Sequence, residues 1–200
     1  MDEQAFPVIA LVCSTGGLDA LTRVLGQLPA DFPAAIIVLQ HIDPKAHSSL
    51  TAILDRRTPL TVLEGTDGVE LRPGQVLVAP PGSHTLVTGL GTIALIESGA
   101  RPPYRPSADL LLTSLALSVG ARAVAVVLSG HGIDGATGAT AVHRFGGIVI
   151  ASDEESSTEF SMPRATIIRD TILDHVIALD AIPALLVALA TAPKIETRGD

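Results

Sequence analysis

Six short apolar runs recur along the chain, and polar residues, glycine or proline bound each of them. Continuous runs of this length are typical of strands that are buried on both faces of a parallel sheet. We therefore expect strands at residues 8–12, 35–40, 76–79, 124–128, 147–151 and 176–179.

Between these runs, leucine and valine recur three or four residues apart, which is the period of a helix with one buried face. The pattern is clearest at residues 18–28, 50–54 and 111–119. Alternation of strands with helices predicts the α/β class. We expect a single doubly wound, mostly parallel sheet flanked by helices.

Residues 60–98 show a different pattern. Short alternating pieces are joined by turns rich in glycine and proline, which is typical of hairpins. We expect an antiparallel hairpin extension here, inserted into the doubly wound fold. Without a linker or repeat in the sequence, residues 1–200 are expected to form one domain, with a core of about 8–189 and a short tail at 190–200.

Composition narrows the classes of function. The formal net charge of −8 disfavours a nucleic-acid surface, and a single cysteine cannot build a disulfide framework. The acidic start does not resemble a signal peptide, and the apolar stretch 181–192 is shorter than the roughly 20 residues that span a bilayer. We expect a cytoplasmic protein without membrane insertion.

Three polar residues with complementary chemistry follow predicted strands. Ser14 ends the first apolar run, His41 follows the second strand, and Asp134 follows the strand at 124–128. Because parallel strands end at one edge of a sheet, these side chains can meet there. A histidine can take the proton of a serine nucleophile, and a carboxylate can orient that histidine.

Each of these residues also has a purely structural explanation. A serine before Gly16 and Gly17 can be a helix N-cap, a histidine after a strand can be a surface residue, and Asp-Gly is common in turns. The order Ser, His, Asp also differs from that of α/β hydrolases, and Val12 stands where their nucleophile motif has glycine. The pattern alone leaves these alternatives open.

Two further chemistries are less favoured. Cys13 could be the nucleophile, but it ends a buried strand, where cysteine behaves as a small hydrophobe. The spacing of His41, Asp43 and His47, with His131 and Asp134 as further ligands, could attract zinc. The loop at Pro44 makes a convergent geometry unfavourable, so we expect no metal.

Five motifs in register resemble the catalytic domain of the chemotaxis receptor methylesterases, the CheB family. The likeness runs from about residue 8 to about residue 189. The motifs are Ser14-Thr15-Gly16-Gly17, Gln40-His41, Arg105-Pro106-Ser107-Ala108-Asp109, Ser129-Gly130-His131-Gly132-Ile133-Asp134-Gly135-Ala136, and Asp153-Glu154 followed by Met162-Pro163-Arg164.

The resemblance implies a serine hydrolase that needs no cofactor. It would hydrolyse glutamate γ-methyl esters on the cytoplasmic helices of chemoreceptors to glutamate and methanol, and some members also deamidate glutamine. Ser14, His41 and Asp134 would be nucleophile, base and acid. Backbone N–H groups near Thr15 and in the loop 130–132 would stabilise the oxyanion, and the substrate pocket would be formed by Thr15, Gly16, His131 and Met162.

The chain departs from the family pattern in three ways. The catalytic fold begins within the first ten residues, without the usual receiver domain, so we expect a stand-alone enzyme or an excised domain, with a separate response regulator or methyltransferase as a partner. His131 replaces the usual methionine, and Cys13 replaces a small residue.

Three arginines are expected near the active edge of the sheet. Arg101, Arg105 and Arg164 could dock an acidic receptor helix, or they could be ordinary solvated residues. Two alternatives to the methylesterase remain: a non-catalytic regulatory module of a chemosensory-type pathway, and an esterase for another substrate.

Overall fold

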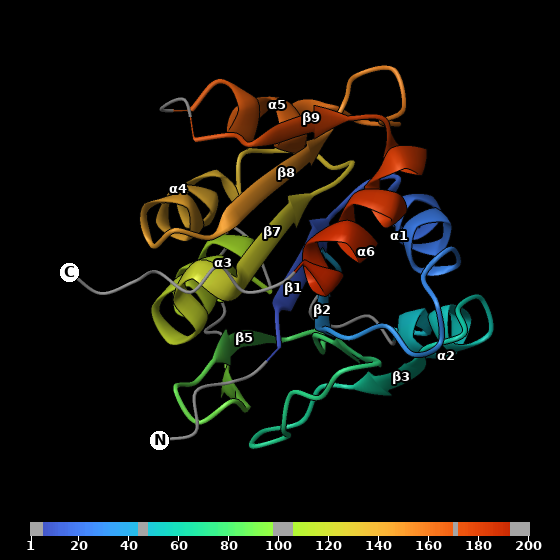
Figure 1. The fold of residues 1–200 in the computed structure, drawn as a ribbon, viewed down its shortest axis with the longest axis vertical. Helices are drawn as coiled ribbons and strands as arrows, with labels where there is room; N and C mark the ends of the chain where they lie inside the picture. Colours follow the sequence, from blue (N-terminus) through green and yellow to red (C-terminus); the bar gives the residue numbers. More distant parts are fainter. Residues whose placement is uncertain (1–5, 44–47, 98–105, 170–171, 193–200) are drawn as a thin grey trace.

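The computed structural model describes residues 6–43, 48–97, 106–169 and 172–192. Its main element is a seven-stranded sheet in the order β3-β4-β2-β1-β7-β8-β9, in which every pair of neighbours is parallel (Figure 1). The strands are β1 (Val8–Cys13), β2 (Ala35–Gln40), β3 (Thr61–Glu64), β4 (Gln75–Val78), β7 (Ala123–Val127), β8 (Ile148–Ser152) and β9 (His175–Ile177).

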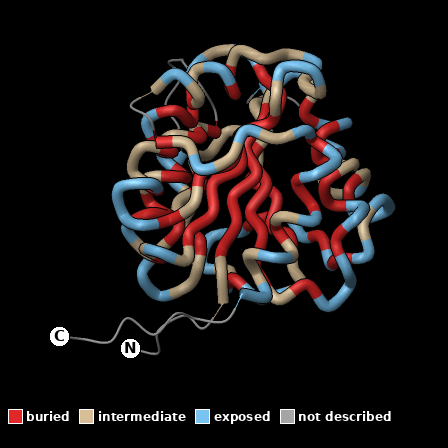
Figure 2. Tube along the Cα trace, turned by 45° about the horizontal axis from the view of Figure 1, so that its top comes forward, coloured by how far each residue is buried: buried red, intermediate tan, exposed pale blue. Residues whose placement is uncertain are grey.

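Strand β1 is the centre of the molecule. All six of its residues are fully buried, and the strand pairs with β2 on one side and β7 on the other. Figure 2 shows this block of buried strands enclosed by partly exposed elements. A strand covered on both faces must be apolar throughout, which explains why the run before Ser14 has no alternation.

Helices cover both faces of the sheet, as the alternating pattern predicted (Figure 1). Alternate residues of β1 pack into different cores: Ala10 and Val12 lie with α3 and α4, whereas Ile9 and Leu11 lie with α1 and α6. The helices are α1 (Gly17–Leu25), α2 (Leu50–Asp55), α3 (Ala108–Val119), α4 (Ala136–Arg144), α5 (Ser161–Ile167) and α6 (Ile182–Thr191).

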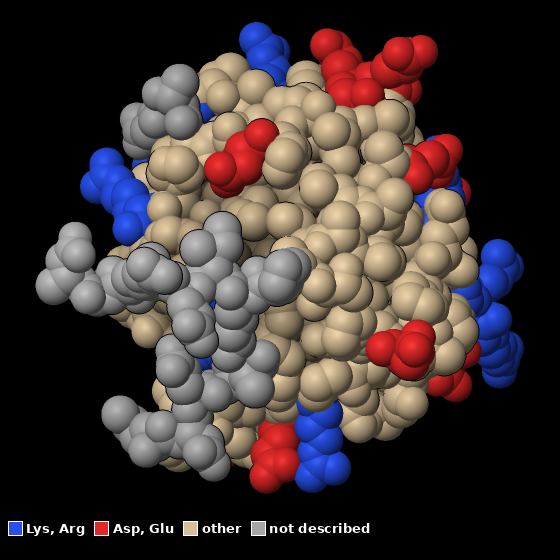
Figure 3. All heavy atoms as spheres, viewed as in Figure 1, with Lys and Arg blue, Asp and Glu red and all other residues tan. Residues whose placement is uncertain are grey.

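The surface over α6 carries few charges. This helix has no acidic or basic side chain, and Figure 3 shows the charged residues of this face gathered around its rim. Its Pro183 stands in the first turn, where a missing backbone N–H costs no helical hydrogen bond. No helix in the described parts of the chain is long and apolar enough to cross a membrane.

The doubly wound fold is confirmed, but the antiparallel part is smaller than predicted. Among the described residues of this region, β5 (Ser83–Val87) and β6 (Ile93–Glu97) form a hairpin, which is bonded to α3 through Ser114 and Ser118, and a single antiparallel bridge joins Glu70 to Thr92. The pieces at 61–64 and 75–78 pair in parallel as β3 and β4. The segment between β3 and β4 contains glycine and proline, as a hairpin turn does. The local pattern therefore could not show that this segment returns to the start of β3, so that β4 runs parallel to it.

Smaller differences concern the ends of elements. Strand β9 begins at His175, one residue before the predicted strand, and Leu179 already belongs to a 3₁₀ turn, Leu179–Ala181. A second 3₁₀ turn, Gly120–Arg122, joins α3 to β7. Shifts of one or two residues are ordinary, because strand ends fray where the ladder stops.

Candidate active site

The three predicted residues, Ser14, His41 and Asp134, lie at the edge of the sheet where β1, β2 and β7 end. The backbone N–H of Ser14 donates to the carbonyl of Ser129 at 2.9 Å, and that of His41 donates to the carbonyl of Cys13 at 3.0 Å. Strand pairing therefore continues past β1 toward both neighbours. It places His41 on one side of Ser14 and the loop that carries Asp134 on the other.

His41 and Asp134 are in direct contact. Nε2 of His41 lies 2.9 Å from Oδ2 of Asp134, and the two side chains are only 10% and 3% exposed. A buried imidazole–carboxylate pair of this kind fixes the ring and the position of its protons. The two residues are 93 positions apart in sequence, and only the parallel topology brings them together.

The carboxylate of Asp134 is held by the first turn of α3. Oδ1 accepts hydrogen bonds from Ser107 Oγ at 3.2 Å and from the N–H of Asp109 at 3.0 Å, and Oδ2 also accepts from the N–H of Ala108 at 2.7 Å. Burial acts to raise the pKa of Asp134, but the hydrogen bonds from His41 and from these two N–H groups lower it below its usual value. Asp134 is therefore a carboxylate at neutral pH.

Sequence reasoning missed the part that this α3 turn plays. The motif that contains Ser107 and Asp109 was recognised as typical of the family, but it was given no function. A Ser-x-Asp pair before an apolar helix is a signal for a helix start. Nothing in the sequence indicated which group from elsewhere in the chain would occupy that start.

Gly130 is pressed between Ser14 and Met162. A Cβ atom at this position would lie 2.8 Å from Cβ of Ser14 and 2.3 Å from Sδ of Met162, so no larger residue fits without displacement. The N–H of Met162 donates to the carbonyl of Gly130 at 2.8 Å, and the Met162 side chain is fully buried. Met162 thus lies behind the loop beside the serine and does not present an open wall to a substrate.

The backbone N–H groups around Ser14 fall into two sets. Those of Gly17 and Gly130 are used internally, by the carbonyls of Ser14 and Glu159 respectively, each at 2.9 Å. This removes Gly130 from the oxyanion donors expected in its loop. Among the hydrogen bonds of the described residues, none uses the N–H groups of Thr15 or Gly16.

The turn that carries these two N–H groups is held firmly. Ser129 Oγ donates to the carbonyl of Thr15 at 2.7 Å and accepts from the N–H of Glu159 at 2.9 Å. Gly16 has φ +79°, a left-handed conformation that favours glycine. A Cβ atom there would lie 2.7 Å from both Ser129 Oγ and Thr158 Cβ, so the space is closed as well.

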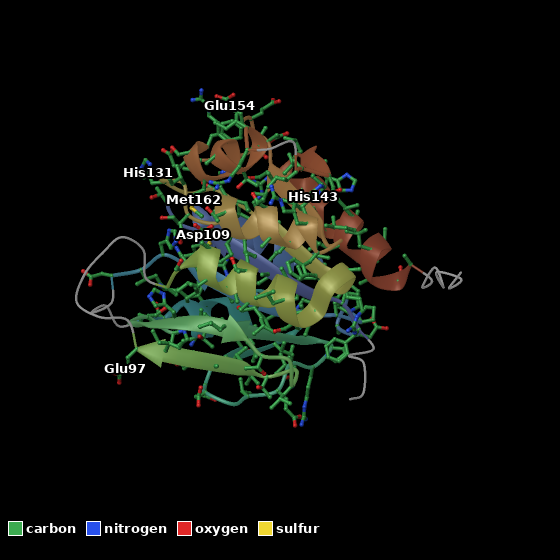
Figure 4. The ribbon with its side chains drawn as sticks, turned by 90° about the vertical axis from the view of Figure 1, so that its left-hand side faces the viewer. Glu97, Asp109, His131, His143, Glu154 and Met162 are labelled. Carbon is green, nitrogen blue, oxygen red and sulfur yellow. The ribbon has the colours of Figure 1, made fainter. Side chains whose placement is uncertain are left out.

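His131 lies at the outer rim of the site. Its side chain is 67% exposed, and Nδ1 lies 3.3 Å from Oε2 of Glu159. Figure 4 shows His131, Met162 and Asp109 on one side of the molecule, with His143 far from them. The predicted pocket residues therefore differ in exposure: Thr15 and His131 face solvent, whereas Met162 is buried.

A hollow of about 810 Å³ adjoins this rim. Of the three arginines expected at the edge, Arg164 lines it, whereas Arg101 and Arg105 lie outside the described residues. The lining combines acidic, basic and apolar side chains: Gly132, Ile133, Glu154, Glu159, Phe160, Ser161, Arg164, Ala165 and Ile168.

The two less favoured chemistries find no support at the site. Burial raises the pKa of the Cys13 thiol far above its usual range, and the sulfur packs where a Cβ of Gly17 would stand. Within the described ranges, no three His, Cys, Asp or Glu side chains are grouped to hold a metal ion. His47, one of the ligands considered, lies outside those ranges.

Comparison with known proteins supports the family suggested by the motifs. The sequence model described as "CheB methylesterase" matches residues 9–186. A protein-glutamate methylesterase/protein-glutamine glutaminase of Pseudomonas syringae is 39% identical over 184 residues, which are 92% of this chain and 47% of that protein. The protein-glutamate methylesterase FrzG of Myxococcus xanthus is 41% identical over 163 residues, 82% of this chain and 49% of FrzG.

A solved structure agrees with these matches. The crystal structure of the CheB methylesterase catalytic domain from Thermotoga maritima superposes with a TM-score of 0.87 at 35% identity, covering 92% of this chain and 99% of that one. The chain spans about half the length of the curated relatives that it matches. With the fold and the motif register in agreement, the chain belongs to the CheB methylesterase family.

Proposed function

We propose that this chain is a serine hydrolase that cleaves glutamate γ-methyl esters on chemoreceptor-like proteins and releases methanol. The observation that carries the proposal is the buried contact of His41 with Asp134 beside Ser14, at one edge of the sheet. Relatives that share this region bear the names of protein-glutamate methylesterases, which supports the choice of ester.

The geometry suggests how the proton moves. Because Nε2 of His41 is bonded to Asp134, the other ring nitrogen, Nδ1, is the one that accepts the proton of Ser14. Ser14 Oγ attacks the ester carbonyl and forms a C–O bond, and the carbonyl electrons move onto oxygen. His41 then returns its proton to the departing methoxide, and methanol leaves an acyl-enzyme.

The second half of the reaction repeats the first with water. His41 removes a proton from water as its oxygen attacks the acyl carbon, and it returns that proton to Ser14 as the C–O bond to the enzyme breaks. Asp134 keeps its negative charge throughout and stabilises the imidazolium formed in each half. The products are the glutamate side chain and free enzyme.

The negative charge on the substrate oxygen needs donors that point at it before the reaction begins. The N–H groups of Thr15 and Gly16 suit this role, because no bond among the described residues uses them and the turn that carries them is held by Ser129. Gly130 is not a donor in this proposal, because its N–H is bonded to Glu159.

The same site suits a second substrate, a glutamine side chain. The names of several Pseudomonas relatives include protein-glutamine glutaminase. Attack of Ser14 on a carboxamide leads to the same acyl-enzyme: His41 protonates the departing NH₂ group in place of methoxide, the C–N bond breaks, and ammonia is released. We include this deamidation in the proposed function.

Methanol release from a methylated receptor cytoplasmic fragment tests the proposal. We expect release by the wild type and a loss on the order of 10⁴-fold or more in Ser14→Ala. Ser118→Ala is a matched control, because the Ser118 hydroxyl donates to the carbonyl of Val87, on the hairpin. It should keep wild-type activity.

Other outcomes would redirect the assignment. Binding of the fragment without release by any variant would contradict the esterase and favour a regulatory module. Hydrolysis of simple esters that depends on Ser14, without release from receptor fragments, would keep the nucleophile and contradict the substrate.

A further inference from the structure

At the starts of helices α3 and α4, an aspartate from each side accepts hydrogen bonds from backbone N–H groups of the other. Asp134, which precedes α4, accepts hydrogen bonds from the start of α3, as described above. In return Asp109, in the first turn of α3, accepts from the start of α4: its Oδ1 lies 2.9 Å from the N of Gly135 and 2.8 Å from the N of Gly138. The start of each helix is thus capped by an acidic side chain from the start of the other.

The exchange satisfies groups that would otherwise lack partners. The first N–H groups of a helix have no acceptor within it, and the helix dipole favours negative charge there. The N-cap residue of helix α4 is Gly135, which has no side chain to cap the helix. Asp109 supplies the missing acceptor from the neighbouring helix.

The two helices meet too closely to shift independently. A Cβ at Gly138 would lie 2.5 Å from Cβ of Leu112 and 2.9 Å from the carbonyl oxygen of Asp109. The hairpin adds a further restraint, because His84 Nδ1 accepts the N–H of Ser107 at 3.1 Å. The position of the Asp134 carboxylate therefore depends on how the two first turns are joined.

We propose that Asp109 is a positioning residue for the reaction, which holds the Asp134 carboxylate in the place where it meets His41. The inference rests on the proposed function. Asp109 touches neither the substrate nor His41 in this proposal. It acts through Gly135, which directly follows Asp134 along the chain, and through Gly138 in the first turn of α4.

An aspartate at position 109 buries a charged group near Asp134, which an uncharged capping residue would not do. Burial, together with the charge of Asp134, raises the pKa of Asp109, although the bonds from Gly138 and Gly135 oppose this. Serine or asparagine caps helices about as well without a charge. What the proposal requires is the side-chain oxygen, because Oδ1 of Asp109 accepts two N–H groups at once from the segment that follows Asp134.

Two substitutions separate positioning from general stability. Asp109→Ala removes the acceptor, and we expect kcat for methanol release to fall by about 10–100-fold with KM little changed, since a small misplacement of a catalytic group costs this much. Asp109→Asn keeps an oxygen that can accept from Gly135 and Gly138. It should restore kcat to within about fivefold of the wild type.

Asp174 provides a matched control. Its Oδ2 also accepts a backbone N–H, that of Val149 at 2.8 Å, but at the end of β8 that lies away from the site. Asp174→Ala should lower the thermal unfolding temperature without lowering kcat when both are measured well below the transition. A wild-type kcat in a folded Asp109→Ala variant would overturn the proposal, as would an equal loss of kcat in the Asp109→Asn variant.

A second measurement keeps the test independent of turnover. The ring proton between His41 Nε2 and Asp134 should give an NMR resonance in wild type and Asp109→Asn that shifts or disappears in Asp109→Ala. An unchanged resonance in the alanine variant would contradict the inference. Absence of methanol release by the wild type would instead contradict the proposed function, and the NMR comparison would still decide the role of Asp109.

Discussion

Two helices begin near Ser14, the proposed nucleophile, and they begin in opposite ways. Helix α3 starts with a side-chain cap from Ser107, and the carboxylate of Asp134 occupies its first N–H groups. Helix α1 has Gly16 as its N-cap residue, without a side-chain cap, and the N–H groups of Thr15 and Gly16 have no acceptor among the described residues. At the start of α3 the backbone N–H groups are thus bonded to a carboxylate of the protein, and we call this the filled start. At the start of α1 the N–H groups of Thr15 and Gly16 are available, and we call this the open start.

The difference corresponds to two kinds of charge. Asp134 bears a charge that is present at all stages, so its site can be filled permanently and buried. An oxyanion exists only during the reaction, so its donors must be arranged in advance and left without a partner. We therefore expect substitutions at the filled start and at the open start to differ in their effects on activity and on stability.

Asp134→Asn should have the largest effect, because it damages the filled start directly. The amide can accept at one position only, and its NH₂ group faces donors at the other. We expect kcat/KM for methanol release to fall by about 10⁴-fold, as in other triads that lose this carboxylate. Asp174→Asn is the control, and a loss of less than about tenfold in Asp134→Asn would argue that His41 works without its partner.

Gly16→Ala should have the next largest effect, on the open start. The new Cβ meets Ser129 Oγ and Thr158 Cβ at 2.7 Å and must hold φ near +79°, at a cost of about 1–3 kcal/mol. Displaced N–H donors should lower kcat by about 10²-fold. These losses are measured by methanol release and by urea unfolding.

Gly68→Ala is a matched control for this substitution. Gly68 has φ +78°, but a Cβ there has nothing within 4 Å. It should show a stability loss of about 1 kcal/mol and an unchanged kcat. Equal effects of both alanines on kcat would mean that the space around Gly16 does not position the donors.

Acidification should reduce the contribution of ionised Asp134 to the free energy of unfolding, over a pH range that follows from the lowered pKa of this residue. Since the pKa of Asp134 is lowered in the folded state, its ionised form stabilises the fold above the unfolded value of about 3.9, and this contribution is lost as the pH falls through the folded value. Urea unfolding from pH 7 to pH 3 should show the difference between wild type and Asp134→Asn steady above about pH 4 and shrinking below it. A difference that grows on acidification would contradict the lowered pKa.

His131→Met, which restores the residue usual in the family, should have the smallest effect. The side chain is mostly exposed, and its Nδ1 lies 3.3 Å from Oε2 of Glu159. We expect kcat/KM to change by less than about threefold at pH 7. A larger change, or a displaced pH profile, would mean that the histidine side chain reaches the substrate.

The strands and the three candidate catalytic residues could be predicted because their signals are local. A buried parallel strand is apolar throughout, and polar residues such as Ser14 and His41 mark where it ends. Because parallel strands end at one edge of a sheet, Ser14, His41 and Asp134 could be expected near one another, but the strand pattern alone left a structural role open for each, and the resemblance to the family was needed to assign the chemistry. The mutual geometry of His41 and Asp134 agrees with that expectation.

What could not be predicted depends on pairs of distant segments. The parallel pairing of β3 with β4 is set by which edge of β4 remains available beside β2. The exchange between Asp109 and Asp134 requires two helix starts to meet, and the use of the Gly130 N–H requires Glu159 nearby. None of these leaves a periodic or compositional signal in its own stretch of sequence.

The burial of Cys13 has a practical consequence for studying motion at this site. Cys13 is the single cysteine of the chain, its side chain has no exposed surface, and it directly precedes Ser14. A thiol reagent can reach the sulfur only when the end of β1 separates from Gly17 and its neighbours. The rate of labelling therefore reports how often the end of β1 next to Ser14 opens, without any added probe.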